Sequence, residues 1–153
     1  MNREEIKCYA DLIRATSEER AKAFNQKRDA AKSAADRKRD ELVARMRPLL
    51  DVLQSVNNDP TLPDKVYVLH EDGPLINSDG NIRGWPEITS RDSYAQRTDA
   101  VRILINDHGR IELFQPPKNN RDGKTLFSAN DAHDLVPNLI VLIADMTRQR
   151  EIL

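Results

Sequence analysis

With 153 residues, the chain is long enough for one domain, or for a small domain with an extension, but not for several large domains. Hydrophobic residues make up 39% of the chain and charged residues 32%, so the chain has enough apolar side chains for a modest core. The formal net charge of −1 argues against a protein that attracts nucleic acid or membranes through its overall charge.

Charge is distributed unevenly along the chain. Residues 1–57 carry 13 Lys and Arg against 10 Asp and Glu, whereas residues 58–153 carry 11 against 15. Residues 20–39 hold eight basic and two acidic side chains. The sequence therefore contains one locally basic stretch in a nearly neutral chain.

Cysteine usage and apolar runs bear on location. Cys8 is the single cysteine, so no disulfide can form within the chain, which suits a reducing compartment. The charged first residues lack the apolar segment of a secretory signal. The longest apolar run, residues 135–146, is interrupted by Pro137 and Asn138 and is too short for a membrane span. We expect a cytoplasmic protein without a membrane partner.

Residues 3–57 predict a long helical arm, because they contain no glycine and one proline and place apolar residues along one sector at about 100° per residue. The repeat follows 3.6 rather than 3.5 residues, which favours straight packing over a long supercoil. Thr16 and Glu19 have capping-box spacing, so the arm could break near Thr16. Pro48 is expected to kink it.

The arm is too long for the rest of the chain to cover. Fifty-five helical residues span roughly 80 Å, whereas the radius of gyration of the remaining ~95 residues is near 13 Å. Either the arm folds back near Thr16, or its apolar sector pairs with a second chain. We expect pairing, as a homo-oligomer and most simply a dimer. The expected interface residues are Ile6, Ile13, Phe24, Ala31, Ala35, Leu42, Met46, Leu49 and Leu53.

Beyond the arm, residues 65–70 predict a strand because they are rich in β-branched and aromatic side chains. Residues 71–99 are polar and punctuated by Gly and Pro, so they predict a long loop with short strand pieces around Ile76 and Ile82. Loops of this length are often functional. We therefore look there first for a contact surface.

Residues 101–115 predict a β-hairpin. If residues 107–109 form a three-residue loop with a left-handed Gly109, Ile105 faces Ile111 and Ile103 faces Leu113. A two-residue turn at 108–109 would instead set Asn106 against Ile111. The three-residue register keeps one face apolar, so we prefer it.

The end of the chain predicts a helix at about 129–150. Ser128 or Asn130 could cap it, and Pro137 could mark a new first turn. Its apolar face would lie across the hairpin. The sequence thus predicts an α+β fold in which a helical arm (1–57) precedes a small α+β unit (58–153), whose antiparallel sheet carries the C-terminal helix.

The sequence shows no catalytic, cofactor or metal motif: a Walker loop, a dinucleotide fingerprint and a nucleophile elbow are all absent. Residues 75–82 imitate part of a calcium loop, but Leu75 and Pro86 stand where the strongest carboxylate ligands belong, which favours an ordinary Asp-Gly turn. His70, His108 and His133 lack a second ligand at metal spacing. We expect no enzymatic activity and no cofactor. A small metal-dependent or acid–base enzyme around the histidines is the weakest alternative.

The basic stretch supports a second hypothesis, in which a helix face binds nucleic acid or a nucleotide through phosphate contacts. Phe24 is its one aromatic residue and lies on the apolar sector, so base stacking is unsupported. A solvated helix face is the commoner interpretation. The candidate anion contacts are Arg20, Lys27, Arg28, Lys32, Arg37, Lys38 and Arg39.

The leading hypothesis is a non-enzymatic binding protein that self-associates through its arm and holds or blocks a macromolecular partner, foremost a protein. Its general style, a helical arm on a small α+β unit without a catalytic motif, is similar to small phage or mobile-element accessory and inhibitor proteins. Trp85 either anchors a partner or fills the core. The candidate partner contacts are Asn77, Asp79, Arg83, Trp85, Lys118 and Arg121.

Overall fold

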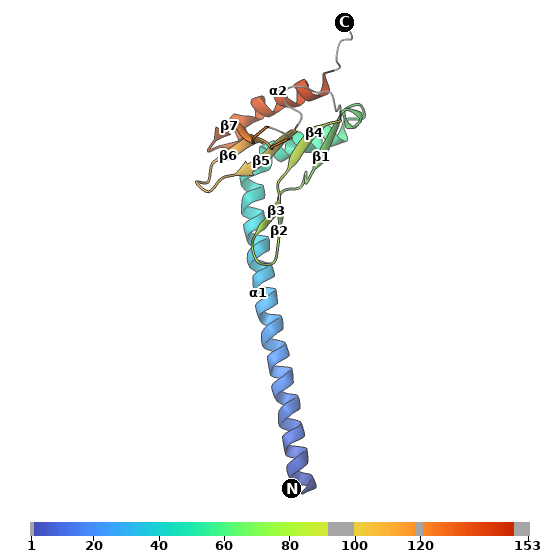
Figure 1. The fold of residues 1–153 in the computed structure, drawn as a ribbon, viewed down its shortest axis with the longest axis vertical. Helices are drawn as coiled ribbons and strands as arrows, with labels where there is room; N and C mark the ends of the chain where they lie inside the picture. The colour runs from blue at the N-terminus through green and yellow to red at the C-terminus, as the bar shows by residue number, and fades with distance from the viewer. Residues whose placement is uncertain (1, 92–99, 119–120, 149–153) are drawn as a thin grey trace.

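In a computed structural model, which describes residues 2–91, 100–118 and 121–148, a long helix projects from a small unit of sheet and helix (Figure 1). This confirms the predicted α+β class. The elements follow in the order α1 (Arg3–Asn58), the 3-10 helix η1 (Leu62–Asp64), β1 (Val66–Leu69), β2 (Leu75–Ile76), β3 (Ile82–Gly84), β4 (Glu87–Ser90), β5 (Ala100–Ile105), β6 (Ile111–Gln115), β7 (Lys124–Ala129), the 3-10 helix η2 (Ala132–Leu135) and α2 (Val136–Thr147).

Helix α1 is continuous through the position where the sequence predicts a break. It begins after Asn2, whose Oδ1 accepts a hydrogen bond from the backbone N of Glu5 at 2.8 Å. The Thr16 hydroxyl donates to the carbonyl of Leu12 at 2.8 Å, so it bonds back into the same helix. The predicted break is wrong, because a cap requires a non-helical backbone at Thr16, and the Ala-, Arg- and Glu-rich residues after it favour continuing the helix.

Pro48 lies inside α1. A proline within a helix lacks the N–H of one hydrogen bond and clashes with the carbonyl four residues earlier, so it bends the helix. Figure 1 shows α1 rising as a straight rod and then turning across the small unit. The bend predicted near Pro48 is present, and it lays the last turns of α1 against the small unit.

The main sheet has five antiparallel strands in the order β1-β4-β5-β6-β7. The predicted three-residue hairpin register is confirmed, because Ile105 pairs with Ile111 and Ile103 pairs with Leu113. Gly109 has a φ of 77°, the left-handed conformation that the turn requires. The hairpin therefore presents one apolar face.

Strand β4 was hidden in the predicted loop 71–99, of which residues 92–99 lie outside the described part of the chain. The expected strand pieces at Ile76 and Ile82 are present as β2 and β3, but β4 pairs with both β1 and β5 in the main sheet. Its single buried residue is Ile88. Four residues with one buried side chain carry too little alternation to predict a strand.

The chain after β6 also differs from the prediction. Residues 124–129 form the edge strand β7, and α2 begins at Val136, with Pro137 in its first turn. The cap is neither Ser128 nor Asn130: Asp131 caps η2 by accepting a hydrogen bond from the backbone N of His133 at 2.9 Å. Residues 124–129 form a strand because they pair with β6, and the local capping signals around Ser128 do not reveal this pairing.

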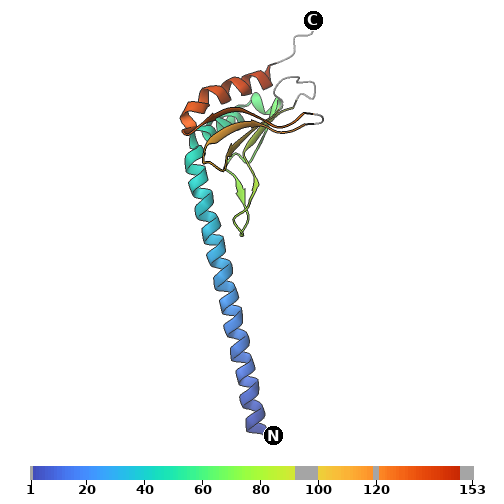
Figure 2. The ribbon, with the colours of Figure 1, turned by 60° about the vertical axis from the view of Figure 1, so that its left-hand side comes forward.

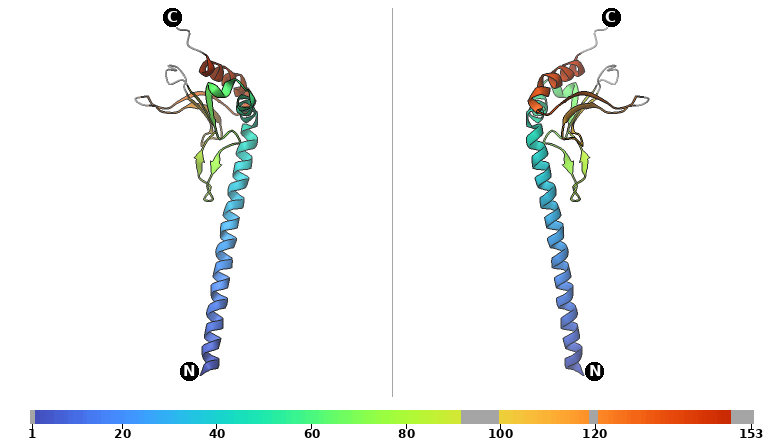
Figure 3. Two further views of the ribbon diagram at one scale, coloured as in Figure 1. Left: turned by 90° about the vertical axis from the view of Figure 1, so that its right-hand side faces the viewer. Right: turned by 90° about the vertical axis from the view of Figure 1, so that its left-hand side faces the viewer.

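The core lies between one face of the sheet and the two helices. In Figure 3, α2 and the upper end of α1 lie on one side of the sheet and leave its other side open. On the open face Tyr67 is half exposed, and Arg102 forms an ion pair with Glu87 at 3.9 Å. The fully buried large core side chains are Met46, Leu49, Leu50, Leu53, Ile88, Val101, Ile103, Ile111, Leu113 and Leu139.

The β2–β3 hairpin forms a separate two-stranded sheet that runs along α1 (Figures 1 and 2). Lys38 Nζ donates to the carbonyl of Gly80 at 2.8 Å, while Arg39 donates to the carbonyls of Pro74 and Asp72 at 3.2 Å each. Gly73 approaches the helix so closely that a Cβ there would lie 2.5 Å from Val43 Cγ2. The hairpin is therefore fastened to α1 by polar bonds and by a close backbone contact.

Candidate functional site: the free helical arm

The most conspicuous unexplained surface is the N-terminal part of α1. Residues 2–34 are exposed throughout, and Ala35, beside the β2–β3 hairpin, is the first buried residue of the helix. A compact chain of 17.5 kDa exposes about 7,900 Å², whereas this chain exposes 10888 Å². We call residues 3–34 the free arm, since none of its residues is covered by the described part of the chain.

Large apolar side chains lie on the free arm in contact with solvent. Phe24 follows Ile6 by about five helical turns, so their side chains point the same way, and Ile13 lies in the same sector. Tyr9 and Leu12 were not predicted, because they lie outside the stripe counted from Ile6: at about 100° per residue they are about 60° and 120° away from Ile6, both on the same side of the sector. Exposed fractions are 54% for Ile6, 59% for Tyr9, 62% for Leu12, 70% for Ile13 and 66% for Phe24.

The second half of the predicted interface lies elsewhere. Met46, Leu49 and Leu53 are fully buried in the chain's own core, and Leu42 is half-buried. In this structure these residues cannot contact another copy, because the bend at Pro48 turns their stripe onto the sheet and α2. Ala31 remains exposed, whereas Ala35 is buried. Because they are buried, Met46, Leu49 and Leu53 are removed from the expected interface. Ile6, Ile13, Phe24 and Ala31 are exposed and remain in the interface hypothesis.

The basic stretch divides at the hairpin. Lys38 and Arg39 bind carbonyls of the β2–β3 hairpin, so their donors are engaged within the chain. Arg37 bonds back to the carbonyl of Ser33 at 3.4 Å. Four of the candidate anion contacts are exposed on the free arm and form no ion pair with the residues that the structure describes: they are Arg20, Lys27, Arg28 and Lys32.

The predicted partner contacts form two separate groups. Asp79 lies in the β2–β3 turn, where its carboxylate accepts hydrogen bonds from Asn81, and Asn77 closes the same turn. Arg83 is exposed on β3, whereas Trp85 packs partly against the core.

The second group is the exposed pair Lys118 and Arg121, whose backbones bond to each other between β6 and β7. In Figure 2 the ends of β6 and β7 project away from α1, while the β2–β3 hairpin follows it. The six residues therefore do not converge on one surface.

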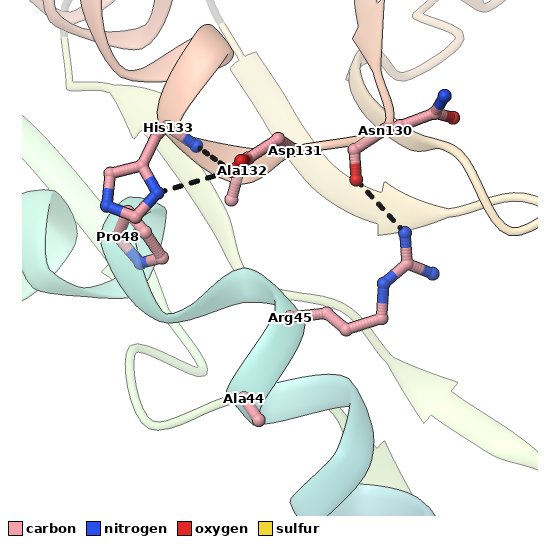
Figure 4. Close-up of a pocket in the computed structure, with 7 residues that line it drawn as sticks. All are labelled: Ala44, Arg45, Pro48, Asn130, Asp131, Ala132 and His133. Atoms are coloured by element: carbon pink, nitrogen blue, oxygen red, sulfur yellow. Dashed lines mark hydrogen bonds and ion pairs between the residues drawn. The ribbon is translucent and has the colours of Figure 1, made fainter.

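A shallow hollow lies beside the Pro48 bend, between α1 and η2 (Figure 4). Arg45 donates to the carbonyl of Asn130 at 3.2 Å, and Asp131 Oδ1 lies 3.2 Å from His133 Nδ1. The backbone N–H and the ring of His133 hold the pKa of Asp131 below its usual range. The Arg45 bond joins α1 to the residue before the η2 cap, whereas the Asp131 bonds cap η2 itself. The lining contains no serine, threonine, cysteine or lysine: it consists of Ala44, Arg45, Pro48, Asn130, Asp131, Ala132 and His133.

The three histidines occupy three different places. His70 has a φ of 54° and its ring lies against Gly84, His108 is exposed in the β5–β6 loop, and His133 is exposed on η2. Among the described residues, no three His, Cys, Asp or Glu side chains come together in a group that could hold a metal ion. In the described part of the chain, no helix is both long enough and apolar enough to cross a bilayer.

Comparison of the chain with protein-family models gives no match, and neither the curated proteins nor the solved structures contain a significant match to it. The geometry of the free arm and of the small unit must therefore carry any functional argument.

Proposed function

We propose that the chain is a cytoplasmic, non-enzymatic binding protein that associates with a second copy of itself through the free arm and uses its small unit to hold or block a macromolecular partner. One observation carries this proposal: the free arm exposes Ile6, Tyr9, Leu12, Ile13 and Phe24 along 32 residues that nothing in the described chain covers. Extended apolar surface on a soluble chain is typical of an interaction site.

The expected strength of association follows from the size of these side chains. Complete burial of a large apolar side chain contributes about 1.5–3 kcal/mol, but the five are only 54–70% exposed, so part of each side chain is already covered. Ten such side chains in a pair would contribute roughly 10 kcal/mol, which is similar to the association cost of about 4–15 kcal/mol. We therefore expect a weak dimer whose population depends on concentration.

Replacing Ile13 by aspartate should abolish self-association, because a charge would have to be buried in the middle of the apolar sector. The matched control is Val141→Asp, which changes an exposed apolar residue on α2, away from the arm. Sedimentation velocity at about 1 to 100 μM, a range that detects association free energies of about 5–8 kcal/mol, should show a monomer for Ile13→Asp and a dimerising chain for Val141→Asp. Equal behaviour of the two variants would contradict the proposal.

The partner-binding half of the proposal concerns the surface of the small unit. Asp79, Arg83, Lys118 and Arg121 are exposed there, and Tyr67 stands on the open sheet face with Arg91 5.4 Å from its ring centroid. Aromatic and arginine side chains are enriched at protein interfaces. A phage-type accessory or inhibitor role, in which one of these separate groups of side chains occludes a protein partner, is the form of the proposal that they support.

A second candidate function is nucleic-acid or nucleotide binding by the exposed cations of the free arm. It is favoured by Arg20, Lys27, Arg28 and Lys32, which lack ion-pair partners among the described residues. If it holds, affinity for a labelled oligonucleotide should fall steeply between 50 and 200 mM salt, by about 10-fold or more for a few phosphate contacts. Weak binding that does not change with salt would end this candidate.

A further inference from the structure

We infer that the arms of two copies pair in antiparallel orientation along residues 3–34, with each β2–β3 hairpin acting as the stop for the end of the partner's arm. This inference rests on the proposed self-association and adds its geometry. Three features of the chain lead to it: the position of the hairpin, the length and side-chain sizes of the free arm, and the charge of its two halves.

The hairpin occupies the same side of α1 as the apolar sector of the arm. Ala35 follows Phe24 by eleven residues, about three turns plus 20°, so it continues that sector, and it is buried. Lys38 and Arg39, on the two flanks of the sector, hold the hairpin there through carbonyls of residues 72, 74 and 80. A partner helix lying on the sector must therefore end before residue 35.

This position excludes close parallel pairing. In a parallel pair residue 35 of one helix faces residue 35 of the other, and both hairpins would need the same space between the two helices. Packed helix axes lie about 8–10 Å apart, which leaves no room for two hairpins. In an antiparallel pair, each hairpin instead meets the N-terminal end of the partner's arm.

The length of the free arm matches such a pair. When residues 3–34 overlap completely, residue 3 of one chain lies beside residue 34 of the other, and the numbers of any two facing residues add up to about 37. Ile6 then lies beside the partner's Ala31, and Ile13 beside the partner's Phe24. A large side chain faces a small one near each end and two large ones meet near the middle, which lets the two straight helices keep one separation. A parallel pair would place large residues together at the tip and alanines together at the base.

The charges of the two halves favour the same orientation. Residues 3–18 carry three basic and four acidic side chains (−1), whereas residues 19–34 carry five basic and two acidic (+3). Antiparallel pairing sets −1 beside +3 at each end. Parallel pairing sets +3 beside +3, and like charges on adjacent helices repel.

The antiparallel pair places the two small units at opposite ends of a rod. Residue 35 of one chain and residue 35 of the other are then about 50 Å apart along the axis, at 1.5 Å per residue. The dimer would therefore present two partner-binding surfaces far apart, each beside the tip of the other chain's arm. Such a particle can hold two partners at a fixed spacing, or bridge two sites on one large partner.

The native Cys8 allows a direct test, because it is the single cysteine and is exposed on the free arm. A nitroxide spin label on Cys8 of the full chain gives the distance between the two copies by pulsed electron resonance. Antiparallel pairing puts Cys8 beside the partner's residue 29, so the two labels should be more than about 30 Å apart. The control is Cys8→Ser combined with Ala21→Cys, a position near the centre of the overlap and about 60° to one side of the apolar sector, so that the label does not lie between the helices.

The label at position 21 should give a distance below about 20 Å in either orientation, because it measures arm pairing itself. A Cys8 distance above about 30 Å with a short position-21 distance supports the inference. A Cys8 distance below about 30 Å with a short position-21 distance would overturn the antiparallel orientation and leave the proposed self-association intact. Long or undetectable distances at both positions, at concentrations up to 100 μM, would overturn the arm pairing and the proposed function with it.

Discussion

Replacing Leu53 by alanine is expected to lower the free energy of unfolding by about 2–5 kcal/mol. Leu53 is fully buried where the last turns of α1 meet the sheet and α2, so the substitution removes apolar contacts and leaves a cavity. Urea denaturation followed by circular dichroism would measure this loss through the midpoint, with the slope unchanged. For a domain of this size, such a loss is a large part of the total stability.

The matched control is Leu12→Ala, the same change on the same helix at a side chain that is 62% exposed. In a dilute, monomeric sample its effect should stay within about 0.5 kcal/mol, because exposed substitutions on a helix cost little. The contrast tests whether α1 is divided into a free arm and a core segment. Similar losses for the two variants would mean that the arm is covered by the chain itself, for instance by folding back onto the small unit.

Replacing Gly73 by alanine should also destabilise the protein strongly. Gly73 has a φ of +129°, a conformation that side chains rarely adopt, and a Cβ there would lie 2.5 Å from Val43 Cγ2. Backbone strain of about 1–3 kcal/mol adds to an overpacking cost of similar size. We expect a loss of about 2–5 kcal/mol, or release of the β2–β3 hairpin from α1. Hydrogen exchange at the backbone N–H of Asn77 would detect this release, because that N–H bonds to Asn81 within the hairpin and a two-stranded hairpin without its helix is only marginally stable.

Gly80→Ala provides the control for the strain alone. Gly80 also has a positive φ, +86°, but nothing lies within 4 Å of the position that a Cβ would take. Its loss should be about 1–2 kcal/mol, without release of the hairpin. If Gly73→Ala cost no more than Gly80→Ala and left hydrogen exchange unchanged, the close contact between hairpin and helix would not hold in solution.

The sequence predicts best those features that local chemistry decides. The β5–β6 register follows from a left-handed Gly109 and from apolar residues at alternate positions, and both signals lie within one short segment. The bend at Pro48 follows from one residue. By contrast, Thr16 shows that a capping motif does not end a helix when the residues on both sides favour helix and the hydroxyl can bond back to Leu12.

Features that depend on distant partners could not be predicted in this way. Strand β4 has one buried residue, Ile88, and is a strand because β1 and β5 lie on either side of it. The β2–β3 hairpin docks on α1 through side chains of Lys38 and Arg39 that bond to backbone carbonyls. Every residue has a backbone carbonyl, whatever its side chain, so the residue types at positions 72, 74 and 80 do not predict this contact.

The candidate site was predicted in part for the same reason. Helical periodicity places Ile6, Ile13 and Phe24 on the same stripe as Leu49 and Leu53, but it cannot tell which part of the stripe the chain covers by itself. The structure divides the stripe: the sheet and α2 bury its C-terminal part, and solvent surrounds the N-terminal part. Only the arrangement of the small unit decides where the division falls.

The mass of the native chain in solution, measured by light scattering during size-exclusion chromatography over a concentration series, tests the central claim most directly. A single chain has a mass of 17.5 kDa. Exposed apolar residues along the free arm predict that the measured mass rises toward that of two chains, about 35 kDa, as concentration increases through the micromolar range. A constant mass of one chain up to 100 μM would contradict the account, because the free arm would then remain in water without a second copy.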